Sequence, residues 1–176
     1  MGESFGQMNS IRIRALDSAE WATFKDFRLQ ALKAAPGMFA SSYEAEVAMT
    51  PEEWQRTIAG PAHQVFGLFD GEDLVAITAA FTWRDDPSGE TALLAMSFIL
   101  PEYRGRGLSR LLYEVRLDWI RTHPQFKRVV VSHRQSNEQS RRAIQRHDFL
   151  PTGRAQRTWP DGTTEDEIFY ELRISD

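Results

Sequence analysis

A basic, glycine-containing turn between a predicted strand and a predicted helix is the part of this sequence best suited to chemistry. A nearly continuous apolar run, Thr91 to Leu100, precedes the turn, and an apolar helical stripe follows it. The first amides of a helix lack intrahelical partners and lie at the positive end of the helix dipole, so they can hold phosphate. Glycines let the backbone approach a ligand closely, and arginines add positive charge. The residues concerned are Arg104, Gly105, Arg106, Gly107 and Arg110.

Two familiar nucleotide-binding patterns do not fit this turn. The GxxxxGK[ST] spacing of a P-loop is missing, and so is a GxGxxG run followed by an acidic ligand for ribose. An ordinary strand-to-helix turn remains the alternative, because glycines and arginines before a helix do not by themselves define a ligand.

The turn resembles a motif of a known family. Pro101 to Leu112 reads P-E-Y-R-G-R-G-L-S-R-L-L, which resembles motif A of the GNAT superfamily of acyl-CoA N-acyltransferases. The signature of motif A is [Q/R]-x-x-G-x-[G/A]; Arg104 and Gly107 match its first two fixed positions, and Ser109 takes the last. Ser109 replaces the usual glycine or alanine, and its small side chain could cap the helix or donate to phosphate.

A second segment further along the chain resembles motif B of the same family, N-x-x-[A/S]…K-x-G-F. The positions that carry this likeness are Asn137, Ser140, Arg146 and Phe149. Arg28 to Leu32 and Ala35 to Phe39 also resemble the first-helix region of many such enzymes. Two motifs in the right order make the resemblance much more specific than either motif alone.

The resemblance implies that coenzyme A binds at the turn. The strand Ser97–Ile99 would splay from its neighbour and pair with the pantetheine arm, and the amides that follow would cradle the pyrophosphate. Asn137 would bond the pantetheine or hold the thioester end. Ser140 lies one turn after Asn137, so we expect it to contact the pantetheine or the phosphates; a neutral helix position is the alternative. The implied cofactor-binding residues are Ser97, Phe98, Ile99, Arg104, Gly105, Arg106, Gly107, Leu108, Ser109, Arg110, Asn137 and Ser140.

The resemblance also implies a reaction, the transfer of an acetyl group from acetyl-CoA to a primary amine in a ternary complex. The amine attacks directly, without a covalent enzyme intermediate, which fits a chain that contains no cysteine. The acceptor is a small molecule or a peptide of unknown identity. Homodimers are frequent among such proteins, so a homodimer is a possible state of this chain.

The sequence departs from the family pattern where proton transfer is concerned. Ile144 stands where many members place the tyrosine that protonates the leaving thiolate, Asp148 replaces a glycine, and Thr91 to Leu100 holds no carboxylate. The remaining candidates for catalysis are His133, expected just past the strand that borders the cleft, and Tyr170 on the last strand. The alternatives are a surface or loop histidine and a tyrosine packed in the final hairpin.

Acceptor binding is expected from the connection between the first two helices, where Phe39 and Tyr43 are the candidate residues. Acidic residues nearby and before the central strand, such as Glu44 and Asp86, would suit a cationic amine. Solvated loops explain the same carboxylates. His63 and His147 have no partner at the spacing of metal ligands, so no metal is expected.

Charge supports a polyanionic ligand. The net charge is −4, yet Arg104 to Arg157 holds 13 Lys/Arg and 4 Asp/Glu, a net of +9, while the rest of the chain carries −13. Nucleic acid could also use such a segment, but the acidic total and the lack of a recognised nucleic-acid motif argue against this partner.

Length and composition fit one soluble domain. The chain has 176 residues, of which 41% are hydrophobic, and it has no apolar run suited to a membrane span. Met1 to Ser10 lacks the apolar core of a signal peptide, so we expect none. We expect a cytoplasmic protein without membrane contact, in which residues 1–10 form a flexible N-terminus and residues 11–176 a GNAT-like domain.

The element pattern indicates an α/β fold. We expect a mixed, mostly antiparallel central sheet of about seven strands flanked by about four helices. The predicted strands are 11–14, 64–70, 74–83, 91–100, 127–132, 154–159 and 165–174. The predicted helices are 21–35, 51–60, 108–123 and 137–146.

Two functions remain open on the sequence. The first is an N-acetyltransferase, and the alternative is a non-catalytic acyl-CoA-binding sensor of the same fold. The missing tyrosine and strand carboxylate favour the sensor, whereas the intact phosphate turn supports both.

Overall fold

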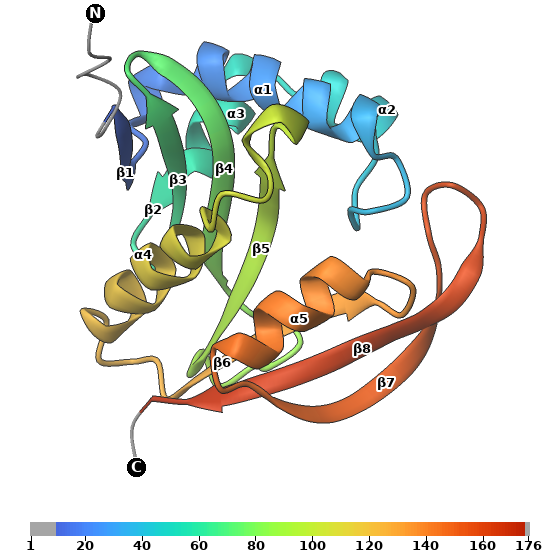
Figure 1. Cartoon of the computed structure of the whole chain (residues 1–176). Helices are drawn as coiled ribbons and strands as arrows, with labels where there is room; N and C mark the ends of the chain where they lie inside the picture. Colours follow the sequence, from blue (N-terminus) through green and yellow to red (C-terminus); the bar gives the residue numbers. More distant parts are fainter. Residues whose placement is uncertain (1–9, 175–176) are drawn as a thin grey trace, which may run out of the picture.

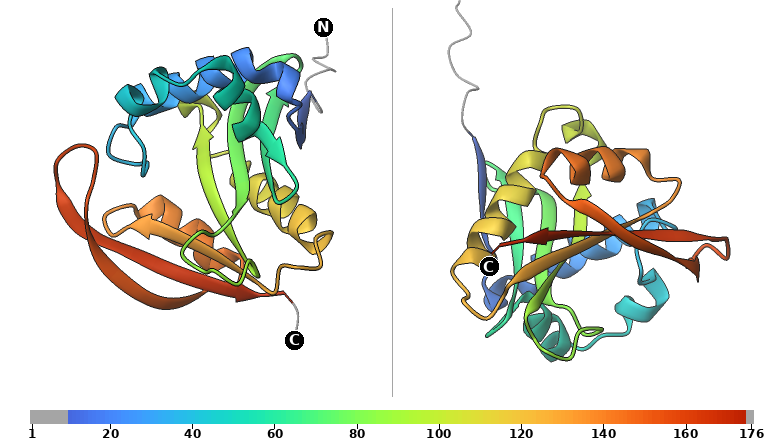
Figure 2. Two further views of the ribbon diagram at one scale, coloured as in Figure 1. Left: turned by 180° about the vertical axis from the view of Figure 1, so that it is seen from behind. Right: turned by 90° about the horizontal axis from the view of Figure 1, so that it is seen from below.

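The protein is a mixed β-sheet covered by helices on both faces (Figures 1 and 2). The computed structural model describes residues 10–174. The strands are β1 (Ile11–Ala15), β2 (Ala59–Gly60), β3 (His63–Asp70), β4 (Asp73–Thr82), β5 (Thr91–Ile99), β6 (Arg128–Arg134), β7 (Leu150–Thr158) and β8 (Thr164–Arg173). The α-helices are α1 (Trp21–Ala34), α2 (Tyr43–Val47), α3 (Pro51–Ile58), α4 (Ser109–Arg121) and α5 (Glu138–Arg146).

The predicted fold class is confirmed. The sheet order is β1-β3-β4-β5-β6-β8-β7, and the described strands pair antiparallel except for β5 with β6. The sequence did not predict α2 or β2, a two-residue strand that pairs with β3. Of the expected flexible segment, residues 1–9 lie outside the described residues.

The two central strands separate along their length. β5 and β6 pair only through Thr91–Leu93 and Arg128–Val130, and beyond these residues neither strand pairs with the other. Figure 1 shows β5 running up beneath α1 while β6 continues with the long β7–β8 hairpin. The expected splay of the strand that contains Ser97 is therefore confirmed.

A bulge interrupts β5 within the separated part. Ile77 of β4 is opposite Phe98 and Ala79 is opposite Ala95, so β5 has one residue more than β4 in this stretch. Met96 takes a left-handed backbone conformation (φ 61°), and the Ser97 and Thr78 hydroxyls lie 2.7 Å apart. Such a bulge kinks a strand and leaves backbone groups unpaired.

Two of the helix starts predicted from the sequence have the expected caps. Asp17 with Glu20, and Thr50 with Glu53, form reciprocal capping boxes, the second of which begins α3. α1 and α3 bury Phe24 and Trp54 against one face of the sheet. α4 and α5 cover the other face around a separate core.

Three predicted boundaries were wrong for local reasons. The helix expected to reach residue 60 ends at Ile58, because Ala59 and Gly60 pair with β3. β6 extends to Arg134 through its pairing with β8, so His133 lies in the strand and not past it. β7 begins at Leu150, and its pairing with β8 accommodates Pro151 and Gly153 through a register shift.

Within residues 10–174, none of the helices has the length and apolarity needed to span a membrane.

Candidate functional site

The turn before α4 has the geometry of an anion site. Gly105 (φ 75°) and Gly107 (φ 74°) take left-handed conformations, and a Cβ added at either would meet nothing within 4 Å. The backbone is therefore open to a ligand at both positions. α4 starts at Ser109 with Leu108 as its N-cap residue and no side-chain cap, so the expectation that Ser109 could cap this helix was wrong. The first amides of a 13-residue helix consequently face this opening.

Two arginines of the turn are held in place by local contacts. Arg104 Nε donates to the Ile99 carbonyl oxygen at 2.9 Å, and its guanidinium lies 5.2 Å from the centre of the Phe98 ring. Arg106 stacks over Tyr103 at 4.8 Å and donates to the Glu102 carbonyl. Both side chains remain exposed and bring positive charge to the turn.

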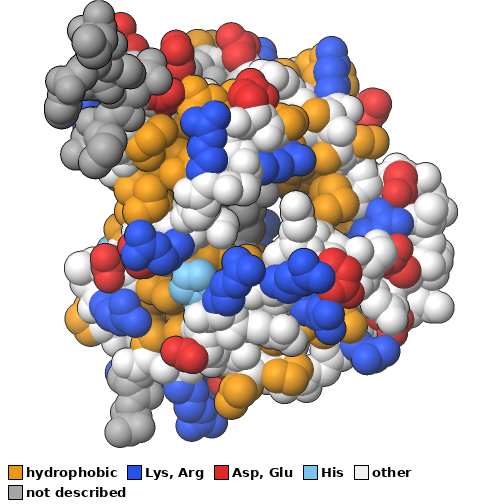
Figure 3. Space-filling model, viewed as in Figure 1, with side chains coloured by type: hydrophobic (Ala, Val, Ile, Leu, Met, Phe, Trp, Pro, Cys, Tyr) orange, Lys and Arg blue, Asp and Glu red, His pale blue; other side chains and the backbone are white. Residues whose placement is uncertain are grey.

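The start of α5 forms the opposite side of the same region. Asn137 is the N-cap residue, and its side-chain oxygen accepts from the Ser140 amide at 3.2 Å, so this oxygen supports the helix. Arg141, Arg142 and Arg146 are exposed along α5. Figure 3 shows a hollow between the beginning of α4 and α5, with blue side chains gathered around it. The exposed arginines of the turn and of α5 therefore form a spatial patch at a concave place, whereas Arg116 and Arg134 of the same basic segment are buried.

The three strand residues expected at the cofactor have different surroundings. Ser97 is exposed although it belongs to a central strand, because β6 has moved away. Phe98 is buried in the core under α1, where it contacts Phe27 and Phe39. Ile99 is partly buried. Phe98 can thus offer a ligand only its backbone.

His133 and Tyr170 meet in the core beneath α5. His133 Nε2 lies 3.0 Å from the Tyr170 hydroxyl, and both residues are buried. His133 Nδ1 lies 2.7 Å from the carbonyl oxygen of Arg134, so Nδ1 carries the proton and Nε2 accepts from Tyr170. The alternative of a surface or loop histidine was wrong. Ile144, at the usual tyrosine position, is fully buried in the same core.

Phe39 and Tyr43 are not brought together. Phe39 is buried under the Arg28 guanidinium and against Phe98, in the core between α1 and the sheet. Tyr43 packs beneath Lys33, whose ammonium nitrogen lies 4.4 Å from the ring centre. Tyr43 also lines an open depression of about 600 Å³ beside α1. A second depression, of about 470 Å³, separates the segment after Phe39 from the β7–β8 turn; its lining residues are Ala40, Ser41, Ser42, Glu44, Ala45, Thr158, Trp159 and Pro160.

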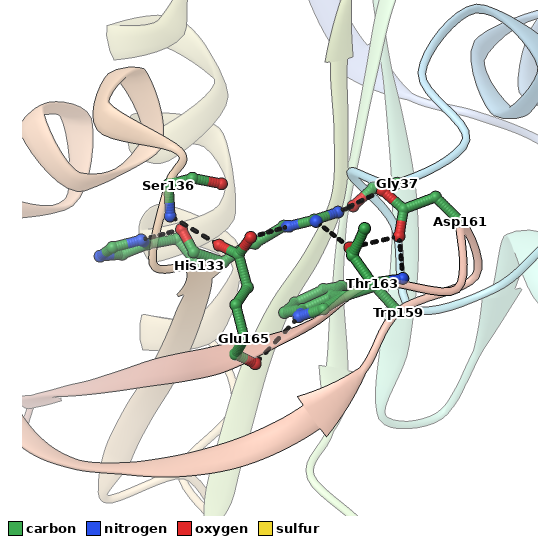
Figure 4. A network of polar contacts seen from close by, with 8 residues as sticks. Gly37, His133, Ser136, Trp159, Asp161, Thr163 and Glu165 are labelled. Carbon is green, nitrogen blue, oxygen red and sulfur yellow. Dashed lines mark hydrogen bonds and ion pairs between the residues drawn. The ribbon is translucent and has the colours of Figure 1, made fainter.

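Arg134 joins the segment after α1, the β7–β8 turn and β8, a contact set that the sequence did not reveal. Figure 4 shows its partners Gly37, Asp161, Thr163 and Glu165 gathered in one network. Arg134 Nη1 donates to the Gly37 carbonyl and to Asp161, each at 2.8 Å, and Nη2 donates to Thr163. Its Nε lies 2.8 Å from Glu165 in an ion pair without hydrogen-bond geometry. The Thr163 hydroxyl and Arg134 lower the pKa of Asp161 to about 2.

The acidic loop before β5 has a structural role. Asp86 accepts hydrogen bonds from Thr91 at 2.5 Å and from Arg128 at 3.2 Å. These bonds, the Thr91 bond foremost, hold the pKa of Asp86 well below its usual range. Asp86 therefore joins the first residues of β5 and β6, where the two strands are still paired. Within the described part of the chain, no group of three or more metal-ligating side chains is gathered.

The opened sheet and the uncapped helix start define a domain that can hold a long, phosphate-bearing ligand where two strands separate. The family model described as "Acetyltransferase (GNAT) family" matches residues 21–149, and the chain belongs to this family.

Solved structures share the fold over nearly the whole chain. A GNAT-family acetyltransferase from Streptococcus pneumoniae superposes with a TM-score of 0.80 at 16% identity, covering 93% of this chain and 99% of its own. The ribosomal-protein-S5-alanine acetyltransferase from Vibrio fischeri gives a TM-score of 0.78 at 17% identity, with 97% of each chain covered. The Salmonella typhimurium protein yncA, solved with its cofactor acetyl-CoA, gives 0.73 at 17% identity over 96% of each chain. A search of curated protein sequences gives no match.

Proposed function

We propose that this protein transfers the acetyl group of acetyl-CoA to a primary amine of a small molecule or peptide, by direct attack in a ternary complex. The observation that carries the proposal is the separation of β5 from β6 beside the uncapped start of α4. A thioester lying in that opening is reachable from the sheet face opposite α5. The acetyl-CoA in the yncA structure and the alanine acceptor in the name of the Vibrio enzyme support the two substrate classes.

Different residues of this chain would bind the phosphates and the pantetheine arm of coenzyme A. The amides of Gly105 to Arg110 and the arginine side chains would hold the phosphates, because backbone and charge are both exposed there. Ser97 and its exposed backbone would border the pantetheine arm. The thioester supplies the activated acetyl group.

The chemistry needs one bond made, one bond broken and two proton transfers. The amine nitrogen bonds to the thioester carbonyl carbon, the carbon–sulfur bond breaks, and the thiolate takes a proton. His133 and Tyr170 are our candidates for the proton donor, since the Tyr170 hydroxyl bonds to His133 and lies in the core that contains Ile144. Positioning supplies a large part of the rate in such a transfer.

The second candidate is a sensor that binds acyl-CoA without turnover. The fully buried Ile144 favours it, because this residue cannot donate a proton. The packing of Phe39 and Tyr43, the residues expected to bind the acceptor, also favours the sensor. Phe39 is buried in the core, and Tyr43 lies beneath the Lys33 ammonium group.

Two measurements separate the candidates. Calorimetry with acetyl-CoA and with coenzyme A tests the shared site, and micromolar affinity supports it. Release of free thiol with a panel of amines, including a peptide with an N-terminal alanine and a polyamine, then tests turnover. Binding without thiol release would support the sensor, and loss of both would overturn the family site in this chain.

A further inference from the structure

The two faces of β6 look toward different parts of the molecule. Val131 and His133 point to the core under α5, so Ser132 and Arg134 point to the opposite face. Residues directly opposite in an antiparallel pair share a face, which places Phe169 and Glu167 of β8 on the side of Ser132 and Arg134.

Ser132 lies at the start of the opening between the central strands. Val130 is the last residue of β6 that pairs with β5, and Ser132 comes two residues later. Its side chain is partly buried and lies on the face opposite α5. An amine that approaches a thioester between β5 and β6 from that face therefore comes close to the Ser132 hydroxyl.

The Ser132 hydroxyl is bonded to a carboxylate. Ser132 Oγ donates to Glu167 Oε1 at 2.6 Å, and Arg157 Nη1 donates to Glu167 Oε2 at 2.9 Å. The Glu167 side chain is only 14% exposed. Arg157 occupies one carboxylate oxygen and leaves the other to the serine.

The neighbouring carboxylates on this side are used differently. Asp161 and Glu165 are bound by Arg134 at the turn of the β7–β8 hairpin. Glu171 lies opposite Val130, where β5 and β6 are still paired. Glu167 is therefore the carboxylate of β8 that a hydroxyl connects to the opening.

We propose that Ser132 and Glu167 form a proton relay that serves the acceptor amine, with Glu167 as the base. The inference rests on the proposed acetyl transfer. As the neutral amine bonds to the carbonyl carbon, its nitrogen becomes acidic and passes one proton to Ser132 Oγ, while the serine passes its own proton to Glu167 Oε1. The carbon–sulfur bond breaks, and the thiolate takes its proton separately. Glu167 later returns its proton to water.

The relay places base and acid on opposite faces of one strand. Ser132 points to the amine side, whereas the next residue, His133, points with Tyr170 to the core under α5. The arrangement also explains how a chain without a carboxylate in Thr91 to Leu100 retains a base at the opening.

The test compares Glu167→Gln with Glu171→Gln, a matched change on the same strand and the same face. The full chain is assayed for thiol release from acetyl-CoA with the best amine of the panel. We expect Glu167→Gln to lower kcat by about 10²-fold or more, with acetyl-CoA affinity unchanged by calorimetry. The deficit should shrink at high pH, where hydroxide can take the proton. Glu171→Gln should stay within about twofold of the parent, since Glu171 lies opposite Val130, where β5 and β6 are still paired, and so away from the opening.

Substitution at Ser132 tests the hydroxyl itself. Ser132→Ala should lower kcat, and Ser132→Thr, which keeps the hydroxyl and suits a strand, should restore it. Thermal unfolding confirms that each variant is folded. A Glu167→Gln rate equal to that of Glu171→Gln, in a chain that turns over amines, would overturn the relay and leave the acetyl transfer standing. Acetyl-CoA binding without turnover of any amine by the parent chain would overturn both.

Discussion

The Tyr103 hydroxyl donates a 2.6 Å hydrogen bond to Asp70 and so ties the turn before α4 to the β3–β4 hairpin. The carboxylate raises the pKa of Tyr103, and the pKa of Asp70 is lowered by hydrogen bonds from Ser10 and Tyr103. Arg106 stacks on the Tyr103 ring. Asp70 therefore orients Arg106 of this turn through the ring between them.

This arrangement predicts a binding defect from a change outside the turn. Tyr103→Phe removes the hydrogen bond but keeps the ring, and we expect coenzyme A affinity to fall by about fivefold, the effect of one ordinary hydrogen bond. Calorimetry measures the change. Glu72→Gln, on the exposed turn of the same hairpin, is the control for altered charge and should bind as the parent does.

Gly107→Glu should abolish coenzyme A binding. The added side chain would point into the open space beside Gly107, and its negative charge would repel the pyrophosphate at the start of α4. We expect an affinity loss of about 100-fold or more, about 3 kcal/mol, measured by calorimetry.

Gly89→Glu is a closely matched control for this variant. Gly89 has the same φ of 74° and the same open surroundings, but it lies in the loop before β5. Both variants carry the same backbone strain and charge, so both should lose similar stability. If coenzyme A binding survives in folded Gly107→Glu, the cofactor lies elsewhere.

The β7–β8 turn should weaken in acid. Because Thr163 and Arg134 lower the pKa of Asp161 from 3.8 to about 2, the folded protein binds fewer protons here than the unfolded chain. The stability from this group is complete above pH 3.8 and is lost as the pH falls toward 2. Asp161→Asn should therefore flatten the pH dependence of unfolding free energy in this window, as denaturant titrations would show. An unchanged slope would mean that the Arg134 contacts do not persist in solution.

Local signals predicted most of the elements, and tertiary contacts account for the rest. The capping boxes at Asp17 and Thr50 could be recognised in the sequence, because their hydrogen bonds join residues only three positions apart. The short helix α2 is not, since the contact that buries it is the pair of Glu46 with Arg28 on α1. A five-residue helix has too few internal hydrogen bonds to be recognised from sequence.

The residues of the candidate site likewise fall into two groups, those that local motifs predict and those that only tertiary contacts bring together. Gly107 and Asn137 lie within contiguous motifs, so their places at the two helix starts could be predicted. Ser132 and Glu167 lie 35 positions apart and meet only through the register of β6 with β8. Nothing in either residue's own neighbourhood gives that register. Burial of His133 likewise depends on the pairing that lengthens β6.

The pair formed by His133 and Tyr170 predicts a catalytic defect without a binding defect. If Tyr170 protonates the thiolate, Tyr170→Phe should lower kcat by about 10²-fold and leave acetyl-CoA affinity unchanged. Thiol release and calorimetry measure the two quantities. The phenyl ring preserves the packing with Ile144, so a rate equal to the parent's would assign Tyr170 a packing role alone.

The buried pair Arg28–Glu46 predicts a stability change that depends on which partner is removed. Arg28 Nε and Nη2 donate to the two Glu46 oxygens at 2.9 and 2.8 Å, and the side chains are only 4% and 11% exposed. Glu46→Gln leaves a buried guanidinium without its counter-charge, so we expect a loss of about 3–5 kcal/mol in unfolding free energy. Denaturant unfolding measures the loss.

Replacing both partners should cost less than replacing one. In the double variant Arg28→Met with Glu46→Leu, no charge remains buried, and the new side chains can pack against Phe39, which now lies under the guanidinium. Glu114→Gln is the control, because its ion pair with Arg110 is largely exposed and should contribute under about 0.5 kcal/mol. A double variant less stable than Glu46→Gln would show that the ion pair specifies the position of α2 as well as neutralising its own charges.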